Sequence, residues 1–370
     1  MEPILPEAML RQGEGLARDL RELAGPCDGQ VQALLDAMEP GTVRKVYLTG
    51  DGDSYHAACA AAMAFVSLAG VACEPLSALR FAEYAAPFLH DPPPERTLVV
   101  AVSASGATPR VVQALERARE RGARTIAVTG AAGSPAGKAA DGALVLALAS
   151  AERSPGIRTY QASLLGMLLL AIRLGGARGA VAPEGAEALL GELEGLADMV
   201  EATRVAIEGR CREVAEMVAG APATVMLGSG PNFGTALYAA AKLAEGAGLV
   251  SLGQEVEEWW HVERFARPAD MPVFVIAPPG RAHWRACEIA EKARERRRRV
   301  IAVTDREDTG VARHACAVLP VAGPVREEFS PLVYHLFAGC LAAHVALRLG
   351  RTPFEAGALE PSGPAAVPAG

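Results

Sequence analysis

The two halves of the chain repeat one pattern, in which short apolar runs alternate with alanine-rich stretches of helical character. The run that begins at Val225 follows the one at Val46 by 179 residues, and Ile301–Thr304 repeats Ile126–Thr129 letter for letter 175 residues later. This nearly constant offset indicates an internal duplication. It excludes a solenoid, whose repeats are roughly 20–50 residues long. Apolar runs separated by helices predict parallel strands buried on both faces. We therefore expect an α/β fold of two tandem domains, each a parallel sheet flanked by helices.

The duplication divides the chain into five expected segments. In order, these are an N-terminal helical segment (1–40), a first α/β domain (41–180), a helical connector (181–221), a second α/β domain (222–350) and a tail (351–370). The tail is rich in Ala, Gly and Pro, so we expect it to be flexible.

Composition and charge exclude several classes of protein. Of 370 residues, 36 are Lys or Arg and 43 are Asp or Glu, and the resulting net charge of −7 argues against a nucleic-acid partner. The short basic run Arg294–Arg299 predicts the solvated end of a helix. The apolar stretch Ala162–Ile172 is shorter than the roughly 20 residues that cross a bilayer, so it predicts a buried core helix and no membrane partner. Seven scattered cysteines without a CxxC pair indicate reduced thiols in a cytoplasmic protein.

A cluster of hydroxyls marks one loop of the first half. The segment Ser103–Thr108 (Ser-Ala-Ser-Gly-Ala-Thr) follows a predicted strand and precedes a predicted helix. Hydroxyls and backbone N–H groups then meet at a helix N-terminus, where the helix dipole favours an anion. Plain N-capping of the helix is the alternative interpretation. The matching loop of the second half, Pro278–Arg281, has no hydroxyl, so we expect one anion site per chain.

On these residues the chain resembles the double-SIS (sugar isomerase) family over residues 40–350. It is similar to the isomerase half of glucosamine-6-phosphate synthase and to amino-sugar-phosphate deaminases and isomerases. The family's S-x-S-G-x-T loop, which holds the sugar phosphate, corresponds to Ser103–Thr108, and its C-G-T-S loop corresponds to Asp51–Ser54. Asp53 thus replaces a threonine and places a carboxylate beside the anion site. The resemblance implies two flavodoxin-like, three-layer α/β/α domains.

The second half carries the more specific part of the resemblance. The family's K-L-K-E, E-L-K-H and D-M-P segments correspond to Lys242–Glu245, Glu258–His261 and Asp270–Pro272. The spacings of 16 residues from glutamate to histidine and of 10 from that histidine to the methionine equal the family pattern.

The resemblance also implies catalytic roles. Glu245 would move a proton between C1 and C2 of a sugar through an enediol, a task that suits a carboxylate. His261 would open the sugar ring, often from a neighbouring subunit, and Lys242 would orient Glu245 or polarise the sugar. From the residues alone, the alternatives are a surface ion pair of Lys242 with Glu245 and a core position for His261.

Further residues are implied to contact the substrate. Arg158 stands where the family has a serine, and its guanidinium suits an anion, with a surface position as the alternative. Trp259 and Trp260 either cover the sugar or fill the lobe interface. The implied substrate contacts are Asp53, Ser54, Ser103, Ala104, Ser105, Thr108, Arg158 and Glu258.

Together these features predict an aldose–ketose isomerase, without cofactor or metal, that acts on a small phosphorylated or otherwise anionic sugar. Two alternatives stay open: an amino-sugar-phosphate deaminase or deglycase, with Asp51 and Asp53 facing an ammonium group, and a non-catalytic sugar-phosphate sensor. Glu355–Gly370 contains no lysine or arginine, so a Schiff-base step by the family synthase's tail lysine cannot be carried over. The family also implies a homodimer with sites near the subunit interface.

Overall fold

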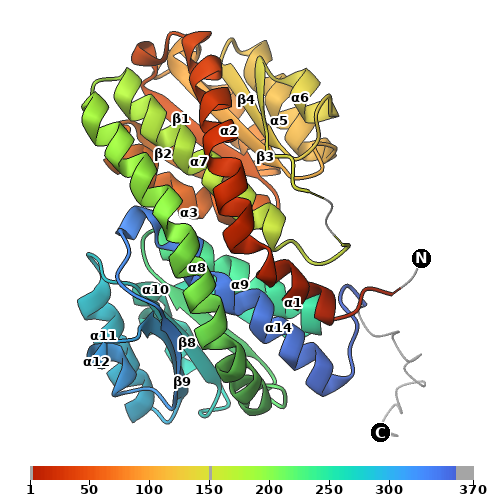
Figure 1. Cartoon of the computed structure of the whole chain (residues 1–370), viewed down its shortest axis with the longest axis vertical. Coiled ribbons are helices and arrows are strands. Elements are labelled where there is room, and N and C mark those ends of the chain that lie inside the picture. The colour runs from red at the N-terminus through yellow and green to blue at the C-terminus, as the bar shows by residue number, and fades with distance from the viewer. Residues whose placement is uncertain (1–2, 150–151, 356–370) are drawn as a thin grey trace, which may run out of the picture.

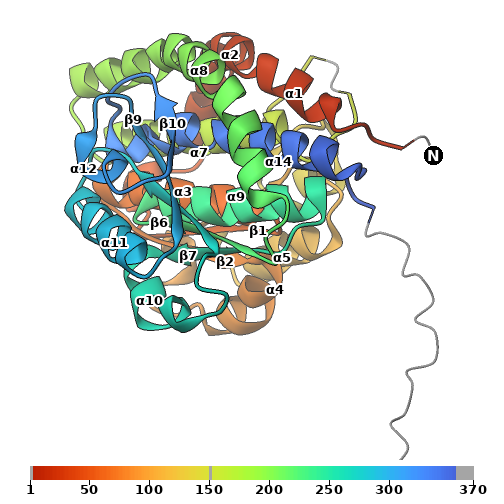
Figure 2. The same cartoon turned by 90° about the horizontal axis from the view of Figure 1, so that it is seen from below.

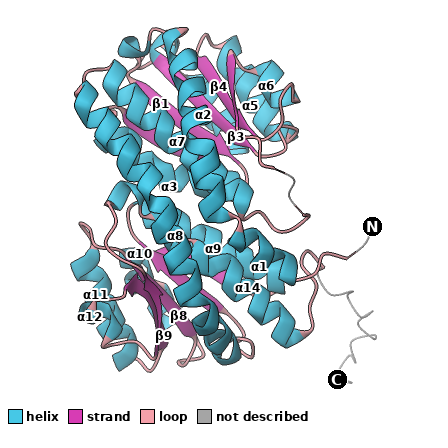
Figure 3. Cartoon of the chain, in the orientation of Figure 1, coloured by secondary structure: helices cyan, strands magenta, loops and turns pink. Residues whose placement is uncertain are grey.

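Each half of the chain forms one five-stranded parallel sheet in the computed structural model, which describes residues 3–149 and 152–355 (Figures 1 and 3). The first sheet has the order β2-β1-β3-β4-β5, and the second, read from the matching edge, has the order β7-β6-β8-β9-β10. The two orders are equivalent, so the predicted α/β fold and its duplication are confirmed. Most of the expected tail, from residue 356 onward, lies outside the described residues.

The first lobe contains β1 (Lys45–Gly50), α3 (Asp53–Ser67), β2 (Ala72–Ser77), α4 (Ala78–Arg80), β3 (Thr97–Ser103), α5 (Pro109–Glu120), β4 (Arg124–Thr129), α6 (Pro135–Ala139) and β5 (Gly142–Val145). The second lobe contains β6 (Thr224–Gly228), α9 (Pro231–Ala247), β7 (Ser251–Glu255), α10 (Val256–His261), β8 (Pro272–Ala277), α11 (His283–Glu295), β9 (Arg299–Asp305), α12 (Thr309–Ala312) and β10 (Ala317–Val321). The remaining helices are α1 (Glu7–Glu14), α2 (Leu16–Asp36), α7 (Arg158–Ala177), α8 (Pro183–Val218), α13 (Pro331–Tyr334) and α14 (Leu336–Leu349).

Three apolar cores hold these layers together. The largest includes side chains from α2, α3, α7, α8, α9 and α14 together with residues of both sheets, so it joins the two lobes. A second core lies on the other face of the first sheet with α5, and a third lies on the other face of the second sheet with α10 and α11. Helices thus cover both faces of each sheet, which explains why the central strands are continuous apolar runs.

The turn from strand to helix is built alike in the two lobes. Gly52 precedes α3 with φ 53° and ψ −127°, and Gly230 precedes α9 with φ 55° and ψ −130°. Glycine alone adopts this backbone conformation freely. The shared turn places the first residues of α3 and α9 above the carboxyl ends of β1 and β6, the equivalent strands of the two sheets.

These equivalent helices, α3 and α9, pack against each other between the sheets (Figure 2). Gly234 permits the close approach, because a Cβ at this position would lie 2.4 Å from the backbone nitrogen of Ala60. Side chains of the second lobe are therefore brought against the first lobe near the beginning of α3.

Two helical stretches have the length and apolar composition of membrane spans, Arg158–Ala177 and Glu327–Leu349. Of their apolar windows, 83% and 72% respectively are buried inside the fold. The predicted core helix Ala162–Ile172 lies within the first of them, and its side chains are buried, as expected.

The basic run Arg294–Arg299 is only partly the solvated helix end that the sequence predicted. Helix α11 ends at Glu295, and Arg298 is 6% exposed. Its guanidinium donates to three backbone carbonyls of the segment 264–268. A guanidinium carries five donors, so one arginine satisfies several carbonyls of a loop that has no strand partner to do so.

Candidate active site

The two loops singled out in the first half lie together at one edge of the first sheet. β1 and β3 are neighbouring parallel strands, and their carboxyl ends continue into residues 50–54 and 103–108. The chain changes its direction of progress across the sheet between these two strands. Such a switch point is where doubly wound sheets bind ligands.

The hydroxyls of the second loop contact one another. Ser103 Oγ and Thr108 Oγ1 lie 2.9 Å apart, and Ser105 Oγ accepts a hydrogen bond from the N–H of Ala107 at 3.3 Å. Thr108 directly precedes α5, yet its side chain makes no capping hydrogen bond. In the structure, therefore, Thr108 does not perform the plain capping that was the alternative interpretation of this loop.

Neighbouring segments hold this loop in place. Gly106 has φ +65°, and a Cβ there would lie 2.3 Å from the Cβ of Ser134. The carbonyl of Gly106 accepts from the N–H of Ala136 at 2.8 Å, and the carbonyl of Ala104 accepts from the N–H of Gly130 at 3.0 Å. The loop is thus tied to the segment that follows β4, which orders it without a ligand.

A cavity of about 190 Å³ lies beside the loop. Its wall includes Ala104 on one side and Thr159 and Ser163 of α7 on another, so hydroxyls line it together with apolar side chains. The complete lining is Ala104, Gly130, Ala131, Leu146, Leu148, Thr159, Ala162 and Ser163. Neutral hydroxyl donors beside the loop Ser103–Thr108 suit a polyhydroxylated ligand.

A buried ammonium group joins the two lobes. Lys242 Nζ lies 2.6 Å from Asp53 Oδ2, at the start of α3, and 2.5 Å from Glu245 Oε2, one turn further along α9. The lysine side chain is 0% exposed, whereas those of Asp53 and Glu245 are 21% and 32% exposed. Lys242 and Glu245 do form an ion pair, but a buried one with a third member from the other lobe. We call these three residues the Lys242 cluster.

The pKa of the Glu245 carboxyl group is raised, so it binds a proton more readily than an ordinary glutamate. Burial raises its pKa, and the negative charge of Asp53 raises it further. The charges of Lys242 and His56 act in the opposite direction. A partly exposed carboxylate with a raised pKa is suited to accept and return a proton near neutral pH.

The segment before α7 connects the Lys242 cluster to the cavity. Gly156 lies between Asp53 of the cluster and Thr159 of the cavity wall. A Cβ at this position would be 2.6 Å from Asp53 Oδ2 and 3.0 Å from Thr159 Oγ1. Tyr238 donates its hydroxyl proton to the carbonyl of Gly156 at 3.0 Å. Its ring stacks on Tyr160 with centroids 3.8 Å apart. These contacts fix the position of Asp53 relative to the hydroxyl-lined cavity.

A groove of about 710 Å³ borders the other side of the cluster. Glu245 and Ala244 line it together with the chain that follows α14, including Arg351 and Phe354. The N–H of Phe354 donates to the carbonyl of Glu245 at 2.7 Å. The glutamate therefore lies at the border between the buried cluster and an open surface.

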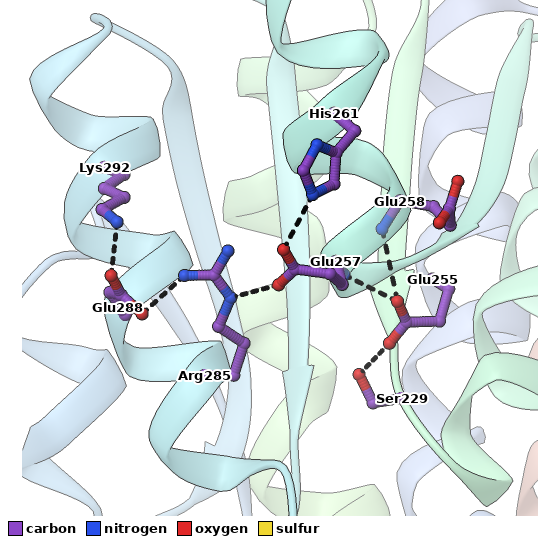
Figure 4. A network of polar contacts seen from close by, with 8 residues as sticks. All are labelled: Ser229, Glu255, Glu257, Glu258, His261, Arg285, Glu288 and Lys292. Atoms are coloured by element: carbon purple, nitrogen blue, oxygen red, sulfur yellow. Dashed lines mark hydrogen bonds and ion pairs between the residues drawn. The ribbon is translucent and has the colours of Figure 1, made fainter.

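His261 and Glu258 are not part of the Lys242 cluster in this chain. His261, at the end of α10, is 62% exposed and its Nε2 lies 3.0 Å from Glu257 Oε1 (Figure 4). Glu258 is exposed, and its backbone N–H donates to Glu255 Oε2 at 3.3 Å. The core position that was the alternative for His261 is wrong, because its imidazole faces solvent.

Ser54 and Arg158 differ in where the structure places them. Ser54 lies in the first turn of α3 beside Asp53 and is half-buried at the switch point. Arg158 is 4% exposed, so its surface interpretation is wrong. Its guanidinium binds Asp19 of α2 through two nitrogens, at 2.5 and 2.6 Å, and the carbonyl of Ala149 at 3.1 Å. These bonds tie α2 to α7, and a contact of Arg158 with the substrate anion stays a prediction.

The tryptophans pack rather than line the site. Trp259 is 0% exposed and belongs to the core on the outer face of the second sheet, not to the lobe interface. Trp260 is half-buried, and the charged groups of Arg264, Lys292 and Arg296 lie 4.2–4.9 Å from the centre of its ring. Cation–π contacts of this kind stabilise the local fold.

Four residues of this region were not among the predicted site residues: His56, Gly156, Thr159 and Ser163. His56 Nδ1 lies 3.9 Å from Asp53 Oδ1, while the other three line or border the cavity. No local motif marks them, because each becomes part of the site only through contacts with distant segments. For Gly156, Thr159 and Ser163, the one available signal was their place in the segment that precedes and begins α7.

Comparison with known proteins identifies the family. The SIS domain model matches residues 42–173 and again 217–346. The chain therefore belongs to the SIS domain family and contains two SIS domains. It is homologous to the SIS half of glutamine–fructose-6-phosphate aminotransferase.

Two curated relatives illustrate this relationship. The glutamine–fructose-6-phosphate aminotransferase (isomerizing) of Gloeobacter violaceus is 29% identical over 346 residues, which cover 92% of this chain and 55% of that protein. The protein of the same name from Thermus thermophilus is 31% identical over 258 residues, covering 69% and 42%. The chain thus spans about half the length of the curated relatives it matches.

Solved structures agree in fold. The C-terminal domain of glucosamine–fructose-6-phosphate aminotransferase from Francisella tularensis superposes with a TM-score of 0.81 at 16% identity, covering 94% of this chain and 97% of that one. Tagatose-6-phosphate ketose/aldose isomerase from Escherichia coli gives a TM-score of 0.74 at 18% identity, covering 95% and 96%. At these identities the likeness establishes the double-SIS architecture.

Proposed function

We propose that this protein is a cofactor-free aldose–ketose isomerase that acts on a sugar phosphate, with Glu245 as the base. The observation that carries the proposal is the carboxylate of Glu245. It is partly exposed, has a raised pKa, and is held by a fully buried lysine next to the switch point of the first sheet. Relatives named as isomerizing aminotransferases and a fold neighbour named as a ketose/aldose isomerase support it.

In the proposed reaction, the hydroxyl loop Ser103–Thr108 binds the phosphate and Ser54 contributes from the neighbouring loop. The open-chain aldose presents its C2 proton to Glu245. The carboxylate removes this proton, and the electron pair of the broken C–H bond forms the C1=C2 double bond while the carbonyl electrons move to O1. A proton passes from O2 to O1 through the enediol. The protonated glutamate then returns its proton to C1 as the C2 carbonyl forms, which gives the ketose. The raised pKa suits both steps, since one group must act first as base and then as acid.

Lys242 orients Glu245 in this proposal and does not react with the sugar. Its ammonium is 0% exposed and lies between two carboxylates. A Schiff base would need a neutral amine that can reach a carbonyl carbon. This favours isomerisation over a deglycase that uses Lys242, and release of ammonium from amino-sugar phosphates distinguishes the deaminase alternative directly.

We further propose a homodimer in which His261 opens the sugar ring bound by a second copy. Support comes from its exposure of 62% and from its exposed apolar neighbours, Val262 at 59% and Phe265 at 68%. Exposed apolar side chains beside a functional group are typical of an interface. Mixing subunits of Glu245→Gln with subunits of His261→Asn tests this.

Each of those two variants alone is expected to be nearly inactive. A mixed dimer would contain one intact site, so random exchange should restore about a quarter of the wild-type activity per dimer. Absence of any recovery in dimers shown to have exchanged would contradict the shared site. Analytical ultracentrifugation of the wild type gives the oligomeric state independently.

The isomerase proposal itself is tested by incubating the protein with aldose, ketose and amino-sugar phosphates. Proton NMR follows interconversion, and a coupled assay follows ammonium. We expect isomer formation without ammonium, its loss in Glu245→Gln, and its retention in Glu288→Gln. Glu288 is a suitable control because it is a second-lobe glutamate paired with Lys292 and with Arg285 at 2.5 Å (Figure 4). Ammonium release would replace the proposal with a deaminase, and binding without turnover would replace it with a sensor.

A further inference from the structure

The Lys242 cluster contains one carboxylate more than its single ammonium group can balance. Burying an ammonium is unfavourable unless a carboxylate pairs with it. One partner would suffice for Lys242, yet Asp53 Oδ2 and Glu245 Oε2 lie at 2.6 and 2.5 Å from the same nitrogen. The two carboxylates therefore compete for one positive charge.

Asp53 is the more firmly held of the two competitors. It is the first residue of α3, where the helix dipole favours a negative group. Oδ2 contacts Lys242 and lies against the backbone of Gly156, and the side chain is 21% exposed, less than the 32% of Glu245. Its carboxylate is thus directed at Lys242 and not at an open site, where it could receive the ammonium group of a substrate.

We propose that Asp53 is a positioning residue: it holds the Lys242 ammonium and so prevents this charge from neutralising Glu245 completely. Lys242 then fixes the direction of the Glu245 carboxylate while leaving it able to take up a proton. The inference rests on the proposed function of Glu245 as the base. It gives Asp53 a role different from the substrate contact that the sequence implied.

Several other groups act on Glu245 and must be held constant in a test. Burial contributes most to its raised pKa, and the charge of Asp53 follows in the same direction. Lys242 on α9 and His56 on α3 oppose both. Tyr238 on α9 and Tyr160 on α7 complete the surroundings, and burial raises the pKa of each, so both remain neutral. Of the three residues whose charges act on the pKa of Glu245, Asp53 alone raises it.

The test is the pH dependence of isomerase activity in the full chain carrying Asp53→Asn. Without the competing carboxylate, Lys242 pairs fully with Glu245, so the acid limb of kcat/KM should move to lower pH. A weaker base should also lower kcat about three- to tenfold on the plateau, with KM nearly unchanged. An acid limb that stays in place would overturn the inference, because a purely structural role predicts only a uniform loss.

Glu74→Gln is the matched control. Glu74 pairs with Lys45 at 2.8 Å on the first sheet, so this variant also removes one ion pair from the first lobe but leaves the Lys242 cluster intact. We expect its acid limb to coincide with that of the wild type. Asp53→Thr is the second variant in case Asp53→Asn folds poorly, and it should move the limb in the same direction.

A second readout does not depend on turnover. Carbon-13 NMR of glutamate-labelled protein, with the Glu245 signal assigned by its loss in Glu245→Gln, follows the titration of this carboxyl group directly. Asp53→Asn should shift that titration to lower pH. If the titration shifts but the protein isomerises no sugar phosphate, the proposed function fails, while the effect of Asp53 on the protonation of Glu245 stands. If the titration does not move, the inference on Asp53 fails whether or not the protein is an isomerase.

Discussion

The two lobes have the same topology but differ at their switch points. In the first lobe, the loop Ser103–Thr108 borders a cavity of about 190 Å³ at the carboxyl ends of β3, β4 and β5. The space at the switch point of the second lobe, at the ends of β6 and β8, is about 10 Å³. There the carboxylate of Glu327 accepts from the backbone N–H of Arg281 at 3.1 Å and from its guanidinium at 2.5 Å. The carboxylate of Glu327 thus binds the loop Pro278–Arg281 of the second lobe.

This difference shows how a duplicated fold can retain one site. In the first lobe, Ser103 and Thr108 contact each other in the loop proposed to bind the anion. The second lobe satisfies its loop internally and instead supplies Lys242 and Glu245 of α9 to the Lys242 cluster. Helix α3 of the first lobe, which is equivalent to α9, contributes Asp53 from its N-terminal end. In the proposed function, binding and proton transfer are thereby divided between the lobes.

The largest expected effect is on kcat, and it compares the loss of Glu245 with the loss of Glu327. Glu245→Gln removes the proposed base and should lower kcat about 10³-fold, within the range typical of a lost general base. Glu327→Gln changes a carboxylate of similar polarity that contacts no part of the Lys242 cluster, so kcat should stay within about threefold. Steady-state kinetics on one sugar phosphate measures both, and equal losses would remove the distinction between the lobes.

The next effect concerns the loop glycines. Gly106→Ala forces a positive φ on alanine and brings its Cβ to 2.3 Å from that of Ser134, so we expect a loss of about 3 kcal/mol in the free energy of unfolding. At Gly280 the nearest atoms, at 2.6 Å, belong to the carboxyl end of Glu327, which can move aside. Gly280→Ala should cost below about 1 kcal/mol. Urea denaturation compares them, and similar losses would contradict the rigidity assigned to the first loop.

A smaller effect is expected for the hydroxyls. Ser103→Ala removes the partner of Thr108 Oγ1 and a donor for the anion, so the Kd for a sugar phosphate should rise about tenfold, as for loss of one hydrogen bond to a charged group. Ser229→Ala, in the second lobe, removes a hydroxyl that is bonded to Glu255 and should leave the Kd unchanged. Calorimetric titration tests this pair, and weaker binding in Ser229→Ala alone would reverse the assignment.

The last effect concerns the pH dependence of stability and arises where the lobes meet. His335 lies edge-on against both Tyr160 and Tyr238, and burial lowers its pKa to about 3. The unfolded chain therefore binds a proton below pH 6.5 that the folded chain does not, so stability falls as the pH drops from about 6.5 toward 3, by about 1.4 kcal/mol per unit. His335→Gln should flatten this part of the stability profile. A slope equal to that of the wild type would show that other groups cause it.

The sequence predicted the central strands and the helices that follow them, because these are long apolar runs with clear punctuation. It did not predict the edge strands β2, β5, β7 and β10. β2 contains Pro75 and β10 contains Pro320, residues that only an edge strand tolerates, and both strands are partly exposed. Without a continuous apolar run, periodicity gives no signal for such strands.

The candidate site was only partly predictable, for a related reason. The loop Ser103–Thr108 and the pair Lys242 and Glu245 are local patterns that a sequence displays. The contact of Asp53 with Lys242 joins residues 189 apart, and that of Arg158 with Asp19 joins residues 139 apart. Ion pairs of this kind follow from how α3, α9, α2 and α7 pack, which no local pattern encodes.

The most direct test of the account is deuterium exchange during turnover. The wild-type protein in D₂O should place deuterium at C2 of the aldose phosphate, or at C1 of the ketose phosphate, as the isomers interconvert, and Glu245→Gln should place none. Proton NMR of these positions resolves both results. Interconversion or deuterium exchange in Glu245→Gln equal to that of the wild type would contradict an enediol formed by this carboxylate.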